Sequence, residues 1–257
     1  MKGLLLLIGE AFREGLQTNR QRDTATSFQP QKMASESHVD FCDYIKKEHG
    51  IKMDIFINTY DTKYEKELKS WYPNCKYKSN KALIGRKALV QNAINKIEKD
   101  HDFIFLTRLD IFIKPYFYSV FNPKWKTIHF ISQTFSIHPR CNGMIETSPV
   151  VNEIFQFYPK KYYYVLNDYS ENGDAWNHYY KTFSIPHSKM DFMVDTRHDS
   201  DSYKDYNPYY RFVGRPESTV WHDRGKKINR TLFGKKQTCK KRDMLYASKT
   251  WKLYHLP

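Results

Sequence analysis

An Arg-x-Asp pair at the end of an apolar run offers the clearest chemistry in this 257-residue sequence. Arg108 and Asp110 directly follow the run Asp102-Phe-Ile-Phe-Leu-Thr, after which apolar residues resume. A carboxylate at the end of a buried strand suits a divalent cation, because Mg²⁺ and Mn²⁺ prefer oxygen ligands and also bind phosphate oxygens. Such a cation would neutralise a departing diphosphate. The alternative is a structural Arg108–Asp110 ion pair that closes the strand.

Two further polar segments also follow apolar runs. The segment from Gly9 to Arg20 contains Arg13, and Thr59-Tyr60-Asp61 follows the run at 53–58. Backbone N–H groups and guanidinium forks suit phosphate oxygens. The sequence contains no Walker A, GxGxxG, HExxH or GxSxG motif, which argues against the nucleotide and hydrolase sites that those motifs build.

The elements that must position these segments are strands and helices in alternation. Continuous apolar runs at 2–8, 53–58 and 102–106 predict strands that are covered on both faces. Amphipathic patterns predict helices over 31–48 and 82–97. This alternation favours right-handed βαβ units and a parallel sheet, which binds ligands at the carboxyl ends of its strands.

The second half of the chain is less regular. Its pattern predicts strands over 127–131, 143–147 and 192–194. A helix is predicted over 148–157, with Ser148 as its cap and Pro149 at its first position, and another over 174–180. Beyond about residue 203 the pattern supports no assignment.

The charge is unevenly distributed along the chain. The formal net charge is +14, and residues 224–242 contain nine Lys or Arg and no Asp or Glu. A basic segment of this kind favours an anionic partner: nucleic acid, anionic lipid or a phosphorylated small molecule. No segment has the ~20 apolar residues of a membrane span, and the first residues fit a buried strand better than a signal peptide. The four scattered cysteines indicate free thiols, so we expect a cytoplasmic protein.

The motifs above resemble those of a known enzyme family. A strand followed by Arg-x-Asp resembles the DxD site of GT-A glycosyltransferases, with the first Asp replaced. The segments Gly9 to Asp23 and Ile55 to Thr62 resemble loops of small glycosyltransferases, of the xylosyl- or rhamnosyltransferase type, from large DNA viruses of algae. The resemblance covers roughly residues 2–200.

This resemblance implies an α/β, GT-A-like single domain, with a Rossmann-like, mostly parallel central sheet flanked by helices. The catalytic domain would span 1–200, with a nucleotide-binding half at 1–114 and an acceptor half at 115–200. Residues 201–257 would form an irregular basic C-terminal segment packed on the same domain.

The resemblance also implies roles for individual residues at the donor. The nucleotide and its diphosphate would be held by Gly9, Arg13, Arg20, Thr59, Tyr60, Asp61, Arg86 and Arg108. Tyr60 would stack on the base, whereas Arg86 is equally well explained as a solvated helix residue. Mn²⁺ or Mg²⁺ would be bound by Asp110, with His222 or His198 as a later ligand. Arg108 in place of the first Asp makes this metal dependence less secure.

The resemblance also implies a catalytic base in the acidic residues before the helix predicted over 174–180. Inverting transfer needs a carboxylate that deprotonates the acceptor hydroxyl. Asp174 is the first candidate and Glu171 the second. The alternative for Asp174 is a helix N-cap, a common position for Asp.

We therefore expect a metal-assisted, inverting enzyme that uses a nucleotide sugar. The resemblance favours a UDP-sugar, with UDP-xylose first, and a glycan or glycoprotein acceptor such as a viral capsid protein. The basic segment could also hold the enzyme against an anionic membrane surface. The alternative function is nucleic-acid binding through this segment and the abundant aromatic residues. We do not expect it, because no nucleic-acid-binding motif occurs.

Overall fold

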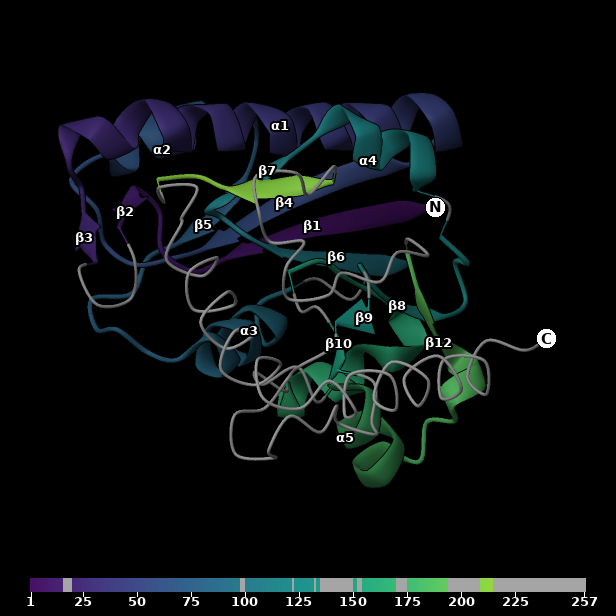
Figure 1. Ribbon diagram of the computed structural model, residues 1–257. Coiled ribbons are helices and arrows are strands. Elements are labelled where there is room, and N and C mark those ends of the chain that lie inside the picture. Colours follow the sequence, from purple (N-terminus) through teal and green to yellow (C-terminus); the bar gives the residue numbers. More distant parts are fainter. Residues whose placement is uncertain are drawn as a thin grey trace, which may run out of the picture.

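The computed structural model of the chain describes residues 1–15, 20–97, 100–121, 123–131, 133–134, 150–151, 154–169, 175–193 and 209–214. At its centre lies a seven-stranded sheet with the order β12-β8-β11-β6-β1-β4-β5 (Figure 1). The strands are β1 (Lys2–Ile8), β4 (Lys52–Asn58), β5 (Lys76–Lys78), β6 (Phe103–Arg108), β8 (Ile128–Phe130), β11 (Gln156–Pro159) and β12 (Met190–Phe192). Neighbours pair in parallel except β11, which is antiparallel to both β6 and β8. The predicted α/β class with a mostly parallel sheet is confirmed.

Helices cover both faces of this sheet. Figure 1 shows α1 (Ala25–His49) and α4 (Pro115–Val120) on one face, with α3 (Arg86–Ile94) and α5 (Ala175–Phe183) on the other. Alternate residues of β1 serve the two cores: Leu5 and Leu7 pack with the α1 side, and Leu4 and Leu6 with the α3 side. This two-sided burial explains why the strand is apolar throughout.

The helix α1 is longer than the predicted 31–48. Its N-cap is Thr24, whose side chain accepts a hydrogen bond from the Ser27 N–H, and it ends at Gly50, which has a φ of 65°. Pro30 is the sixth residue of the helix, so its missing N–H removes one i→i−4 hydrogen bond, the one to the Thr26 carbonyl. The helix α3 is shorter than the predicted 82–97 and begins after Gly85.

The helix predicted over 148–157 is wrong. The described residues of this range form β10 (Val150–Val151), which pairs with β9 (Gln133–Thr134), a bend at Ile154 and Phe155, and the start of β11. Phe157 packs in the core on the α1 side and Tyr158 in the core on the α3 side, which is the alternation of a strand. Aromatic residues favour such a position. A Ser-Pro pair at 148–149 had suggested a helix start.

The other predictions for the second half have mixed outcomes. The strand over 127–131 corresponds to β8, and the helix over 174–180 corresponds to α5. The strand β12 covers Met190–Phe192, so it shares only Phe192 with the predicted 192–194. The strand predicted over 143–147 lies outside the described residues. Within the described ranges, no helix has both the length and the apolar character that crossing a bilayer requires.

Short elements complete the edge where β1, β4 and β6 end. A hairpin of β2 (Arg13–Glu14) and β3 (Gln21–Arg22) follows β1, and β7 (Ile111–Ile113) follows β6. Far along the chain, β13 (Tyr210–Phe212) pairs antiparallel with β7. A segment from beyond residue 200 therefore lies beside the loop that contains Asp110.

Candidate functional site

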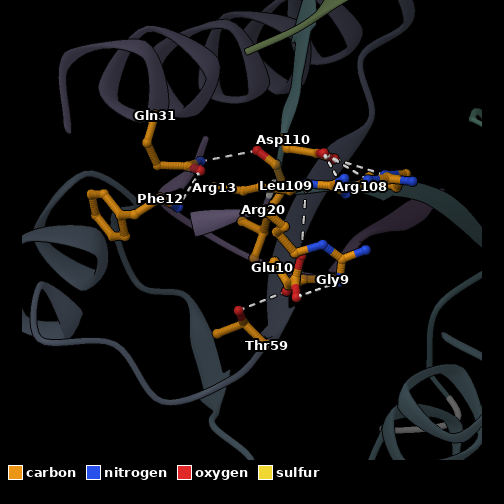
Figure 2. A network of polar contacts seen from close by, with 10 residues as sticks. All are labelled: Gly9, Glu10, Phe12, Arg13, Arg20, Gln31, Thr59, Arg108, Leu109 and Asp110. Atoms are coloured by element: carbon orange, nitrogen blue, oxygen red, sulfur yellow. Dashed lines mark hydrogen bonds and ion pairs between the residues drawn. The ribbon is translucent and has the colours of Figure 1, made fainter. Parts of the chain in front are cut away.

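Three loops meet at the carboxyl ends of β1, β4 and β6. Ile8 pairs with Asn58 in β4 and with Arg108 in β6, so the residues that follow all emerge at one level of the sheet. The Thr59 hydroxyl donates to the Gly9 carbonyl at 2.7 Å, and the Leu109 N–H donates to the Ile8 carbonyl at 3.0 Å. These bonds join the first loop to the other two, and Figure 2 shows the one between Thr59 and Gly9.

A charged network connects the first and third loops (Figure 2). Arg108 donates to both carboxylate oxygens of Asp110, from Nε at 2.7 Å and from Nη2 at 2.6 Å. Arg13 lies between two carboxylates, with Nη1 4.0 Å from Asp110 Oδ2 and Nε 3.8 Å from Glu10 Oε2. Arg20 Nη1 donates to Glu10 Oε1 at 2.9 Å. Positive and negative groups therefore alternate along the network.

The centre of this network is buried and its two ends reach the surface. Asp110 is 1% exposed, Arg13 6% and Glu10 7%. The side chains of Arg20 and Arg108 are 36% and 23% exposed. Three guanidinium groups face two carboxylates, so these five side chains carry a formal net charge of +1. The positive groups at the surface suit an anion, and a guanidinium binds phosphate well.

The first loop has an unusual backbone that the surrounding structure holds in place. Phe12 has a φ of 50°, a region that costs free energy for a residue with a Cβ and that is frequent at functional sites. The side chain of Gln31 in α1 accepts from the Phe12 N–H at 3.0 Å and donates to the Leu109 carbonyl at 2.9 Å. One buried amide thus fixes the first loop against the third.

Hydrogen bonds also fix the far side of the hairpin. Thr24 and Thr26 donate to Glu14 Oε2 at 2.6 and 2.7 Å, and these bonds hold the pKa of the Glu14 carboxyl below its usual value.

A histidine of α1 is also buried near the third loop. Burial lowers the pKa of His38 to about 3. This imidazole, which shares a hydrogen bond with the Tyr72 hydroxyl, is therefore neutral at neutral pH.

The second loop presents one exposed carboxylate. The Asp61 N–H donates to the Asn80 carbonyl at 3.2 Å, while its side chain is exposed. Tyr60 is buried and its hydroxyl donates to the Ile84 carbonyl. The guanidinium of Arg22 lies 5.9 Å from the centre of the Tyr60 ring. The role of Tyr60 in stacking on a base stays a prediction.

The remaining predicted site residues lie on α3 or outside the described chain. Arg86 is the first residue of α3, and its guanidinium lies 5.6 Å from the centre of the Tyr169 ring. Glu171, Asp174, His198 and His222 lie outside the described residues, as does the basic segment 224–242. Their roles stay predictions.

The described residues do not fit the divalent cation that the resemblance implies. Both oxygens of Asp110 accept hydrogen bonds from Arg108, and Arg13 lies near the same carboxylate. Across the described part of the chain, no group of three or more His, Cys, Asp or Glu side chains could hold a metal ion. Mn²⁺ and Mg²⁺ need several oxygen ligands, and here the positive charges already present oppose a cation.

Sequence reasoning missed several residues that shape the site. Glu10 was part of the first loop but received no role, and Gln31 gave no signal because its partners are backbone groups 19 and 78 residues away. The contribution of the segment 209–214 was also missed. Its Phe212 ring lies 5.2 Å from the Arg108 guanidinium, and its Val213 N–H donates to the Asp110 carbonyl at 2.9 Å.

Comparison with protein-family models and with curated proteins gives no match. Solved structures give matches at low identity. A mutant of Drosophila β1,4-galactosyltransferase 7, solved with manganese, UDP-Gal and xylobiose, is 8% identical, with 76% of this chain and 66% of that chain covered and a TM-score of 0.43. For 4-diphosphocytidyl-2C-methyl-D-erythritol synthase from Anaerococcus prevotii the identity is 10%, the coverage 76% and 88%, and the TM-score 0.44.

A third match is a glycosyltransferase involved in the glycosylation of the major capsid of PBCV-1. It is 10% identical, with 88% of this chain and 98% of that chain covered and a TM-score of 0.38. Similarities of this extent identify neither a donor nor an acceptor for this chain.

Proposed function

We propose that this chain is a glycosyltransferase that binds a nucleotide sugar at the carboxyl ends of β1, β4 and β6 and transfers the sugar to a glycan. The observation that carries the proposal is the network of Arg13, Arg20 and Arg108 with Glu10 and Asp110, which has an excess of positive charge. It lies at the edge where parallel sheets bind their ligands. The Arg-x-Asp resemblance adds the reaction class.

The donor would lie across the three loops. The partly exposed guanidinium groups of Arg20 and Arg108 are placed to donate to diphosphate oxygens. The exposed carboxylate of Asp61 is suited to accept hydrogen bonds from ribose hydroxyls. Gly9 and Thr59 would contact the donor between its diphosphate and its ribose, because the Thr59 hydroxyl donates to the Gly9 carbonyl and joins the two loops.

The proposed reaction is an inverting displacement. Asp174 removes the proton of an acceptor hydroxyl, and that oxygen forms a bond to the anomeric carbon of the donor. The bond from this carbon to the diphosphate oxygen breaks, and the nucleoside diphosphate leaves with the electron pair. Glu171 is the second candidate for the base. Positive charge from Arg108 and Arg20 stabilises the leaving diphosphate.

The donor, acceptor and compartment follow from the resemblance alone. A UDP-sugar is the first donor class to test, UDP-xylose the first donor, and a glycan of a viral capsid glycoprotein the first acceptor. Cys42 and Cys75 are free thiols, which agrees with a reducing cytoplasm, of the host if the protein is viral. The Mn²⁺ or Mg²⁺ that the resemblance implies has no part in the proposed reaction.

Turnover of nucleotide sugars tests this proposal. The full chain is incubated with a panel of UDP- and GDP-sugars, with and without oligosaccharide acceptors, and the released nucleoside diphosphate is measured. We expect one donor to be consumed, and faster with acceptor. Asp174→Asn should slow transfer by about 10²–10⁴-fold, the usual contribution of a general base, and leave UDP binding unchanged.

Asp40→Asn serves as the control, because it removes an exposed carboxylate on α1. Its turnover should equal that of the wild type. Consumption of no donor by the wild type would refute the proposed activity. Full transfer by Asp174→Asn would leave the activity standing and remove Asp174 as the base.

A further inference from the structure

We propose that the guanidinium of Arg108 takes the place of a divalent cation, so that this chain binds the diphosphate of its donor without a metal ion. This inference rests on the proposed function, because it concerns the same donor. It departs from the manganese that the resemblance implies. Three features of the described residues support it: the geometry of the Arg108–Asp110 pair, the net charge around it, and the contacts that hold Arg108.

Asp110 could bind a cation only by losing hydrogen bonds to Arg108. Arg108 Nε and Nη2 form two parallel hydrogen bonds, at 2.7 and 2.6 Å, to the two carboxylate oxygens. This is the bidentate fork that makes arginine–carboxylate pairs strong. A cation at Asp110 would have to displace the fork, and Asp110 is buried, so water could replace the lost bonds only poorly.

The charge around the pair favours an anion. The guanidinium groups of Arg13, Arg20 and Arg108 outnumber the carboxylates of Glu10 and Asp110 by one. A divalent cation would raise the charge of this cluster from +1 to +3, within a partly buried region where like charges repel strongly. Binding of a diphosphate would instead lower the net charge of this cluster.

The contacts of Arg108 hold it ready for a ligand. Its Cζ lies 5.2 Å from the centre of the Phe212 ring, so the guanidinium is held both by this ring and by the hydrogen bonds of its edge to Asp110. A guanidinium has five N–H groups, and two donate to Asp110, which leaves three. The side chain is 23% exposed, so a ligand can reach it. Asp110 then acts as a positioning residue that orients Arg108.

The test measures binding of UDP and GDP to the full-length wild type by titration calorimetry, once in EDTA and once in MnCl₂. We expect the affinity for the bound nucleotide to differ by less than about threefold between the two buffers, well under the tenfold change that marks a strong coupling. Binding that is more than about tenfold weaker in EDTA would overturn the inference and leave the proposed function standing. Binding of neither nucleotide in either buffer would refute both.

Two substitutions make the test specific to Arg108. Arg108→Ala should weaken nucleotide binding at least about tenfold in both buffers, as loss of a charged contact to phosphate does. Arg108→Asp converts the Arg-x-Asp turn into Asp-x-Asp, which has two carboxylates for a cation. We expect this variant to lose nucleotide binding in EDTA and to regain part of it in MnCl₂. Wild-type affinity for Arg108→Ala would overturn the inference.

Arg211→Ala provides a matched control. Arg211 also lies over an aromatic ring, 4.9 Å from the centre of Phe112, but it projects from the face of β13 opposite to Phe212. Its affinity for nucleotide should equal that of the wild type. Circular dichroism and thermal unfolding of each variant separate a lost contact from a lost fold. If the Arg108 variants fail to fold, the comparison of EDTA with MnCl₂ in the wild type decides alone.

Discussion

At the scale of single residues, the candidate site depends on a buried side-chain amide whose donor and acceptor both have hydrogen-bond partners. The side-chain amide of Gln31 bonds the Phe12 N–H and the Leu109 carbonyl, two backbone groups in different loops. Phe12 has a left-handed backbone, so this part of the loop stays in place only while the surroundings hold it. We infer that the amide keeps Arg13 and Asp110 in register.

Gln31→Leu should reduce both stability and nucleotide affinity. The apolar side chain leaves two buried backbone groups without their partner, which costs about 3 kcal/mol in the free energy of unfolding. For a domain of this size, Tm should fall by roughly 6–12 °C. Differential scanning calorimetry measures the fall, and titration with UDP measures the accompanying loss of affinity.

Ser35→Ala is the control for this prediction. Ser35 is also buried in α1, but its hydroxyl donates to the Gln31 carbonyl within the same helix and hydrogen-bonds the Tyr72 side chain, rather than a backbone group of the first or third loop. Its loss should cost less than about 1.5 kcal/mol and leave nucleotide affinity intact. Equal effects of the two substitutions would show that Gln31 has no special part in holding the loops.

At the scale of elements, the sequence predicted those whose signal is local. The three buried strands of the first half are continuous apolar runs, so β1, β4 and β6 could be located closely. The first two residues of β11, Gln156 and Phe157, were included in a predicted helix, because the partners β6 and β8 are distant in sequence and the local pattern is ambiguous. The pairing of β13 with β7 was not predictable either, since it joins residues about 100 apart.

The segment 209–214 ties two loops of the site together. Its Gly214 carbonyl accepts from the Gly15 N–H at 2.9 Å, and its Val213 N–H donates to the Asp110 carbonyl. Gly214 has a φ of 65°, and a Cβ there would lie 1.8 Å from the Arg13 carbonyl oxygen. A side chain at this position would therefore push the segment away from the first loop.

Gly214→Ala should accordingly impair nucleotide binding as well as stability. Gly50→Ala is a matched control, because Gly50 also has a φ of 65° but a Cβ there would meet nothing within 4 Å. Both substitutions incur the left-handed penalty of about 1–2 kcal/mol, and only Gly214→Ala adds the clash. Denaturant unfolding and UDP titration compare the two. Equal losses would show that the contact of 209–214 with the first loop is unimportant.

At the scale of the whole molecule, the sequence predicted which loops come together better than it predicted how their charged side chains pair. The first and third loops were expected at the carboxyl ends of the strands, and the structure brings Gly9, Arg13, Arg108 and Asp110 together there. The charge balance was not predictable, because it depends on which side chains pair. An isolated Arg-x-Asp motif is consistent with a metal site, whereas the Arg108 fork on Asp110 favours an anion site.

Thermal unfolding of the wild type with nucleotides, nucleotide sugars and short DNA and RNA oligonucleotides tests the central claim most directly. A nucleotide sugar at a hundred times its dissociation constant adds about 2.7 kcal/mol to the free energy of unfolding. For this domain we predict a rise in Tm of roughly 5–10 °C with one UDP- or GDP-sugar and little change with the oligonucleotides. No rise with any nucleotide, together with a clear rise with DNA or RNA, would contradict the account and favour a nucleic-acid-binding protein.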